Sequence, residues 1–261
     1  MMHVPRRRFG QNFLHDRNII AKIITAIDPR RNEHFVEIGP GQGVLTEPLS
    51  NLLAVLHVVE IDRDLIAVLR ERFPATRLII HAGDALEFDF ATLPCPLRVV
   101  GNLPYNISTP LLFHLARYSD RIVDGHFMLQ REVVDRMVAD PSTPAYGRLS
   151  VTLQARFDMV RLFTVGAGAF TPVPKVESAI VRMRPRAIPL LPAAVEPVFQ
   201  TVVTRAFTQR RKTLRNALAG VADPALLASL DIDPGLRPEA LSVQAFLRIA
   251  TAVHHRDTKA P

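Results

Sequence analysis

Short apolar segments recur between residues 34 and 130 and predict β-strands. They are His34–Ile38, Leu56–Ile61, Arg77–His81, Arg98–Gly101 and Gly125–Gln130. Stretches with helical spacing lie between most of them, namely Val44–Leu53, Arg63–Phe73 and Pro110–Tyr118. Strands that alternate with helices predict an α/β fold, with a parallel sheet that is covered on both faces.

Further elements are expected on either side of this alternation. Asp16 can cap a helix whose isoleucines fall on one face. Two extended runs, Ser150–Phe157 and Ser178–Met183, are expected to add antiparallel edge strands.

The pattern changes after a proline-rich stretch. Arg184–Pro192 has three prolines in nine residues, which predicts a stiff linker. Helical patterns follow to the end, through Val195–Phe207, Lys212–Ala219, Pro224–Leu230 and Ser242–Val253. We therefore predict one domain over residues 1–185 and a smaller all-helical domain over residues 186–261.

The chain is basic, with 32 Lys and Arg residues against 25 Asp and Glu residues, a net charge of +7. This balance favours a polyanionic partner. The single cysteine, Cys95, excludes an internal disulfide framework and a cysteine-rich metal site. The basic N-terminus is not followed by the apolar segment of a secretory signal, and no apolar run approaches the ~18 residues of a membrane span. A cytoplasmic protein is therefore expected.

A glycine-rich turn follows the first strand of the alternation. Gly39-Pro-Gly-Gln-Gly43 has GxGxG spacing, unlike the dinucleotide fingerprint, and its backbone at Gly39 and Gly41 can approach a ligand closely. Glu60 ends the next strand, where it suits both ribose hydroxyls of an adenosine, and Asp84 follows the third strand, where it suits the adenine amine. The glycines alone could form only a tight turn. Together with two acids at successive strand ends, they predict a cofactor that contains adenosine.

The fourth strand leads into Asn102-Leu-Pro-Tyr105. The exocyclic nitrogen of adenine is a poor nucleophile, because its lone pair is delocalised into the ring. Acceptors on both N–H bonds, from the Asn102 carboxamide and the Leu103–Pro104 backbone, would move this nitrogen towards sp³ geometry. Proline fixes φ and so holds the carbonyl in place, and Tyr105 offers a face on which an extruded base can stack. These features predict methyl transfer to an adenine amino group, with a plain turn as the alternative.

Several motifs occur together along the chain: Phe9–Leu14, Glu37–Gly43, Asn102–Tyr105, Tyr146–Val151, Phe170–Ser178 and Gln209–Asn216. With them the chain closely resembles the small-subunit (16S) ribosomal RNA adenine N6,N6-dimethyltransferases, from about residue 8 to residue 250. Loss of activity in the bacterial members of that family gives kasugamycin resistance.

The resemblance implies a Rossmann-like fold, S-adenosylmethionine as the methyl donor, and dimethylation of two adjacent adenines near the 3′ end of the small-subunit rRNA during ribosome assembly. It also implies roles for individual residues. Those that would hold the cofactor are Asn12, Leu14, Gly39, Glu60, Asp84 and Asn102. Phe170 would sandwich the target adenine against Tyr105.

Basic residues in three places are candidate RNA contacts. Lys175 lies beside the acceptor motif, and Arg6–Arg8 precede the first family motif. A denser cluster surrounds the start of a predicted C-terminal helix: Arg205, Arg210, Arg211, Lys212 and Arg215. A solvated helix face is the alternative for this cluster. The histidines show no metal-ligand spacing, so no metal is expected, and a monomer is the default.

Three other functions compete with this interpretation. A large-subunit rRNA adenine methylase of the antibiotic-resistance type would share the cofactor and acceptor motifs but differ at Phe170–Ser178 and Gln209–Asn216. A non-catalytic RNA-binding assembly factor would have degraded motifs, whereas these are intact. The GxGxG spacing and the lack of a placed acid–base pair argue against a nicotinamide oxidoreductase.

Overall fold

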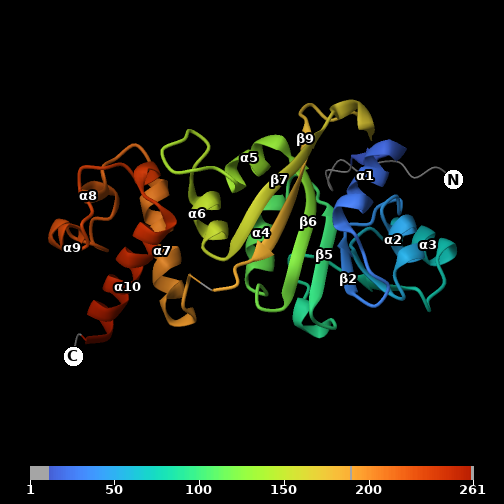
Figure 1. Cartoon of the computed structure of the whole chain (residues 1–261), viewed down its shortest axis with the longest axis horizontal. Helices are drawn as coiled ribbons and strands as arrows, with labels where there is room; N and C mark the ends of the chain where they lie inside the picture. Colours follow the sequence, from blue (N-terminus) through green and yellow to red (C-terminus); the bar gives the residue numbers. More distant parts are fainter. Residues whose placement is uncertain (1–11, 189, 260–261) are drawn as a thin grey trace. The chain divides into compact units, whose positions relative to one another are not determined.

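Seven strands form one mixed sheet in the computed structural model, which describes residues 12–188 and 190–259 (Figure 1). In spatial order they are β4 (Leu78–Ala82), β3 (Leu56–Glu60), β2 (His34–Ile38), β5 (Leu97–Asn102), β6 (Ile122–Gln130), β9 (Ser178–Pro185) and β7 (Phe157–Val165). The first five are paired in parallel, and β9 is antiparallel to β6. The predicted α/β fold is confirmed.

The helices predicted beside these strands are also present. They are α1 (Arg17–Ile27), α2 (Thr46–Leu52), α3 (Arg63–Arg72) and α4 (Ser108–Ala116). Asp16 caps α1 as predicted, because its carboxylate accepts the backbone N–H groups of Asn18 and Ile19. Ile23 and Ile27 of this helix are buried in a hydrophobic cluster with side chains from the sheet, such as Val58 and Val100.

The prediction of a strand over residues 150–157 was wrong. Arg148–Gln154 form helix α6, and β7 begins only at Phe157. The alternation of Val151 and Leu153 with small polar residues suggested a strand, but Ser150 and Thr152 are buried as well. The Ser150 hydroxyl also accepts the backbone N–H of Gly147, so a local cap favours the helix.

The antiparallel strand predicted at Ser178–Met183 is confirmed as β9, but it is not at the edge of the sheet. The edge position belongs to β7, whose half-exposed residues did not predict a strand. A second, two-stranded sheet pairs β1 (Phe13–Leu14) with β8 (Phe170–Thr171). This pairing brings the N-terminal motif beside a segment that lies more than 150 residues further along the chain.

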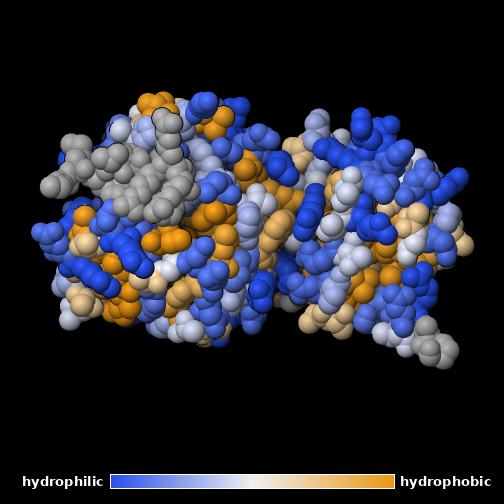
Figure 2. All heavy atoms as spheres, turned by 180° about the vertical axis from the view of Figure 1, so that it is seen from behind, coloured by the Kyte–Doolittle hydropathy of each residue, from blue (hydrophilic) through white to orange (hydrophobic). Residues whose placement is uncertain are grey.

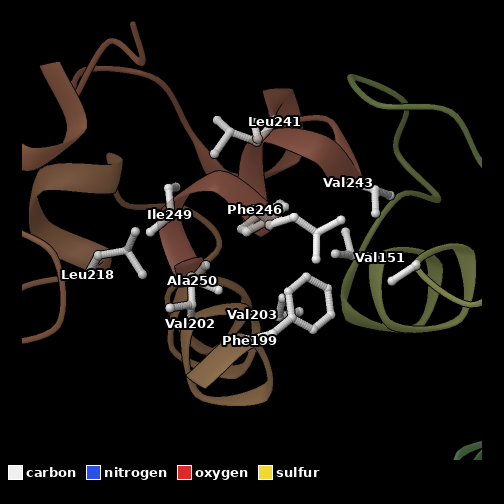
Figure 3. Close-up of a cluster of buried hydrophobic side chains, with 14 of the residues drawn as sticks. Val151, Phe199, Val202, Val203, Leu218, Leu241, Val243, Phe246, Ile249 and Ala250 are labelled. Atoms are coloured by element: carbon white, nitrogen blue, oxygen red, sulfur yellow. The ribbon is translucent and has the colours of Figure 1, made fainter. Parts of the chain in front are cut away.

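The contacts divide the chain into two units, one of residues 1–134 and 159–185, the other of residues 135–158 and 186–261. Residues 135–158 had been expected in the first domain. They pack with the helical unit instead, because Tyr146 and Val151 are buried in its core beside Phe199 and Phe246 (Figure 3). The remaining helices of this unit are α7 (Glu196–Thr208), α8 (Leu214–Ala217), α9 (Pro224–Ser229) and α10 (Val243–Lys259). Helix α5 (Arg131–Met137) begins in the first unit and ends in the second.

Among the described residues, no helix is both long enough and apolar enough to cross a membrane. Hydrophobic side chains reach the surface in patches that are interspersed with hydrophilic ones, on the face shown in Figure 2.

Candidate active site

A cavity of about 280 Å³ opens in the first unit, at the carboxyl ends of β2, β3 and β5. This is where ligands of open α/β sheets bind. All the predicted cofactor and acceptor residues except Phe170 line it: Asn12, Leu14, Gly39, Gly41, Glu60, Asp84, Asn102, Leu103, Pro104 and Tyr105. Tertiary structure therefore brings together residues from separate motifs across some 90 positions of the chain.

The glycine loop and Glu60 form one side of the cavity. Gly41 has a φ of +58°, and a Cβ atom there would lie 3.2 Å from the Phe13 ring, so a larger residue would be strained. The N–H of Gly41 donates to Glu60 Oε2 at 3.2 Å, and the N–H groups of Ile61 and Asp62 donate to Oε1. Burial raises the pKa of Glu60, and these three hydrogen bonds oppose that shift. The loop conformation and the carboxylate therefore support each other.

Asp84 and Ile61 lie at neighbouring strand ends. One carboxylate oxygen of Asp84 accepts the N–H of Leu86 at 2.9 Å, which fixes the side chain at the cavity wall. The backbone N–H of Gly83 donates to the Glu60 carbonyl, which ties the end of β4 to the end of β3. Ile61 lines the cavity although 45 % of its surface is exposed. Ile61 was not among the predicted site residues, although an apolar residue directly after a strand-ending acid is a signal for a ring-binding surface.

Glu37 is a third acid that lines the cavity, beside Glu60 and Asp84, and its sequence motif had suggested no role for it. It lies near the end of β2, is 2 % exposed, and accepts a 2.7 Å hydrogen bond from the Thr46 hydroxyl. Burial raises its pKa from 4.5 to about 7; the Thr46 hydrogen bond opposes this shift and nearby Glu60 adds to it. Its position before Ile38 inside an apolar strand was the available signal, because burial of a carboxyl group is costly and indicates a specific role.

The N-terminal motif closes another side of the cavity. Phe13 packs against Gly41, and Leu14 is fully buried while still lining the cavity. The Asn12 carbonyl accepts a 3.1 Å hydrogen bond from the carboxamide nitrogen of Asn102. This bond defines which end of the amide is nitrogen, so Asn102 Oδ1 is the end left to accept from a ligand.

The acceptor turn follows directly from β5. The N–H of Leu103 donates to the Met128 carbonyl of β6, and the Pro104 carbonyl accepts the N–H of Ile107. A Cβ atom on Gly39 would lie 3.9 Å from the Pro104 ring, so the acceptor turn and the glycine loop are in contact. Gly101 allows this arrangement, because a Cβ atom there would be only 2.6 Å from the Ile38 carbonyl oxygen.

Tyr105 is held at the cavity by its hydroxyl. The phenol oxygen lies 2.7 Å from Oγ of Ser178, which is fully buried on β9. Burial raises the pKa of Tyr105, and the Ser178 hydrogen bond opposes this shift. The phenol therefore stays neutral at physiological pH, and its fixed ring is suited to stacking.

For Phe170, the family resemblance implies that its ring sandwiches the target adenine against Tyr105. Its side chain is 1 % exposed, does not line the cavity, and is buried in the cluster that contains Leu14, Met128 and Ile180. A ring in this position has no open face for a base. The proposed sandwich with Tyr105 would therefore require Phe170 to be uncovered when RNA binds.

The predicted RNA contacts differ in their environments. Lys175, Arg205, Arg211, Lys212 and Arg215 are exposed. Arg210 instead donates to the Pro144 carbonyl at 2.9 Å and lies 3.6 Å from Glu239, so its guanidinium is held within the second unit. Arg210 therefore differs from the other four residues of its cluster in having intramolecular partners among the described residues, although 41 % of its side chain is exposed. Arg6–Arg8 lie outside the described residues.

Backbone hydrogen bonds bring another cation to this cluster. The N–H groups of Leu214 and Arg215 donate to the carbonyls of Leu236 and Pro234, and this places exposed Arg237 beside the start of α8. No spacing pattern in the sequence relates residue 237 to the cluster near residue 212. Within residues 12–188 and 190–259, no group of three or more His, Cys, Asp or Glu residues could hold a metal ion.

The fold and the site define a Rossmann-like methyltransferase that uses S-adenosylmethionine. The family model for ribosomal RNA adenine dimethylase matches residues 2–254. The chain belongs to this family, the S-adenosylmethionine-dependent rRNA adenine dimethyltransferases.

Relatives and solved structures agree with this placement. The chain is 56 % identical to the ribosomal RNA small subunit methyltransferase A of Chromobacterium violaceum, over 98 % of each chain. It is 59 % identical to the protein of the same name from Aromatoleum aromaticum, over 99 % of this chain and 97 % of the relative.

Two crystal structures have similar folds. A dimethyladenosine transferase from Plasmodium falciparum superposes with a TM-score of 0.78 at 24 % identity, over 90 % of this chain and 95 % of that one. The 23S rRNA methyltransferase ErmE superposes with a TM-score of 0.71 at 28 % identity, over 93 % and 99 %. The fold is therefore shared with a 23S rRNA methyltransferase, whereas the two relatives above are named as small-subunit methyltransferases.

Proposed function

We propose that this enzyme dimethylates N6 of two adjacent adenines near the 3′ end of 16S rRNA, acting as a monomer on the assembling small subunit in the cytoplasm. The observation that carries the proposal is the hydrogen bond from Asn102 Nδ2 to the Asn12 carbonyl. It orients the Asn102 carboxamide as an acceptor for an amino group, at the edge of a cavity whose other polar groups suit adenosine.

The residues present fit S-adenosylmethionine, which supplies an electrophilic methyl group when it is bound. Glu60 would accept hydrogen bonds from the ribose hydroxyls, and Asp84 would accept one from the adenine amine. Ile61 offers an apolar surface for the adenine ring. Gly39 and Gly41 allow the backbone to approach the cofactor closely. Asn12 and Leu14 would cover it from the N-terminal side.

At the acceptor turn, the chain would position the target amino group and would not supply a strong base. Asn102 Oδ1 would accept one N–H bond of the target amine, and the Leu103–Pro104 backbone would supply a carbonyl for the other. These contacts strengthen as the nitrogen becomes tetrahedral, so they stabilise the transition state more than the ground state. Tyr105 would hold the extruded base by stacking, with its ring fixed through Ser178.

The second unit would contribute phosphate contacts. Arg211, Lys212 and Arg215 are exposed, and Arg237 lies beside them. We call these four residues the α8 basic surface. Lys175 of the first unit would contact a phosphate close to the target adenine. Contacts of this kind position RNA without reading its sequence.

Incubation with labelled S-adenosylmethionine and immature small subunits, followed by digestion to nucleosides, tests the proposal. The expected product is N6,N6-dimethyladenosine at two adjacent positions, formed far more slowly by Asn102→Ala. Label at other positions of the small-subunit RNA and not at these two would contradict the substrate. A wild-type protein that binds small subunits without transferring methyl groups would instead be a non-catalytic assembly factor.

A further inference from the structure

The loop between β8 and β9, residues 172–177, exposes two valines. Val173 is 67 % exposed and Val176 is 45 % exposed, and exposed Lys175 lies between them in the sequence. Proteins do expose single apolar residues. Two on one short loop, with a cation between them, are a feature that neither the cofactor site nor the acceptor turn uses.

Both ends of this loop are held by residues of the candidate active site. Before it, Phe170 pairs with Leu14, which lines the cofactor cavity. After it, Ser178 lies within hydrogen-bond distance of the Tyr105 hydroxyl. Glu177 is fixed as well, because its carboxylate pairs with Arg131 and its carbonyl accepts the Arg131 N–H at 2.9 Å. The two valines are thus presented on an anchored loop that continues from the acceptor site.

We propose that Val173 and Val176 form an apolar wedge that packs against the nucleotides flanking the target adenine and holds open the gap left by its extrusion. When one base leaves a stack, its neighbours expose apolar faces, and apolar side chains are the residues that fill such gaps. Lys175 between the valines suits the phosphate of the same nucleotides. This inference rests on the proposed function.

A protein partner fits these features less well. Two valine side chains supply a small fraction of the roughly 1,200 Å² that a stable protein interface buries. The loop ends at Ser178, which contacts the Tyr105 hydroxyl, and a ring suited to stacking fits a base rather than a protein surface.

The test uses the full-length enzyme and an RNA oligonucleotide from the 3′ region of 16S rRNA, with 2-aminopurine at the target position. The fluorescence of 2-aminopurine rises when the base leaves the stack. The double variant Val173→Ser/Val176→Ser should reduce this rise severalfold at saturating protein. On the unmodified oligonucleotide it should raise the KM for RNA about tenfold, with S-adenosylmethionine binding unchanged.

Val123→Ser is the matched control, because Val123 is 46 % exposed near the start of β6, at the end of that strand away from the cavity. It should behave like the wild type. Wild-type extrusion and KM in the double variant would overturn the wedge. A defect on small subunits but not on the free oligonucleotide would also overturn it, in favour of contact with a ribosomal protein. If the wild type methylates neither immature small subunits nor the oligonucleotide, the proposed function itself fails and the wedge with it.

Discussion

The carboxamide nitrogen of Asn102 donates a 3.1 Å hydrogen bond to the backbone carbonyl of Asn12, ninety residues earlier in the chain. The fold uses the amide nitrogen of Asn102, so the amide oxygen is already oriented to accept a hydrogen bond from a target amine. The same bond joins the N-terminal segment that covers the cofactor cavity to the acceptor turn. Methyl donor and methyl acceptor would therefore be positioned by one connected structure, as transfer in line requires.

Asn102→Ala should reduce single-turnover methyl transfer about 100-fold at saturating S-adenosylmethionine, because a placed transition-state acceptor is lost. RNA binding should be nearly unchanged. Quench-flow with labelled cofactor measures the first quantity, and filter binding measures the second. A near wild-type rate in a folded variant would remove Asn102 from the acceptor site.

Glu60→Ala should weaken S-adenosylmethionine binding more than tenfold, because a charge-assisted hydrogen bond contributes ~1.5–3 kcal/mol. The variant also leaves the N–H groups of Gly41 and Asp62 without their acceptor, so the glycine loop should loosen. Titration calorimetry measures the affinity, and thermal melts check the fold. Unchanged affinity in a folded protein would exclude Glu60 from the cofactor site.

Glu37→Gln should stabilise the cofactor-free protein at pH 8 and much less at pH 5. The pKa of Glu37 is about 7 in the folded protein and 4.5 when unperturbed, so ionisation of the buried group costs stability as pH rises between these values. The full gain above pH 7 is on the order of 3 kcal/mol, and Gln can still accept the Thr46 hydrogen bond. Urea unfolding at both pH values measures it. An equal change at pH 5 and pH 8 would show that Glu37 does not titrate in this range.

Replacing the four residues of the α8 basic surface with Gln should flatten the plot of log RNA affinity against log salt by about 3 units on duplex-like RNA. RNA binding releases counterions for each phosphate that is contacted, so fewer are released when these contacts are lost. Arg210→Gln is the matched control, since its guanidinium is engaged by Pro144 and Glu239, and its slope should match the wild type. The opposite result, with Arg210 changing the slope and the four others not, would move the RNA surface elsewhere.

Local patterns were sufficient for most of the first unit. Buried parallel strands are short and apolar, so His34–Ile38 was predicted to the residue, and the side chain of Asp16 satisfies the first N–H groups of α1 whatever surrounds it. Strand ends that meet at one sheet edge also made Glu60, Asp84 and Asn102 predictable as one site.

Other features depend on contacts between distant parts of the chain. Val151 and its neighbours alternate like a strand, but burial of both faces and a cap at Gly147 make them helix α6. Arg210 and Arg237 look alike in sequence. In the tertiary structure, the Pro144 carbonyl accepts a hydrogen bond from the Arg210 guanidinium. The hydrogen bond from the N–H of Leu214 to the Leu236 carbonyl places Arg237 in the exposed cluster.

The sequence alone determined the class of fold, the family and the main cofactor and acceptor motifs, because strand periodicity, glycine turns and strand-end acids are local properties. Tertiary structure decided that the Asn102 amide is oriented by Asn12, that the Glu37 carboxyl is buried, and that the Phe170 ring is covered. Orientation, desolvation and accessibility depend on which residues from elsewhere in the chain surround a group, and a linear pattern carries no record of those neighbours.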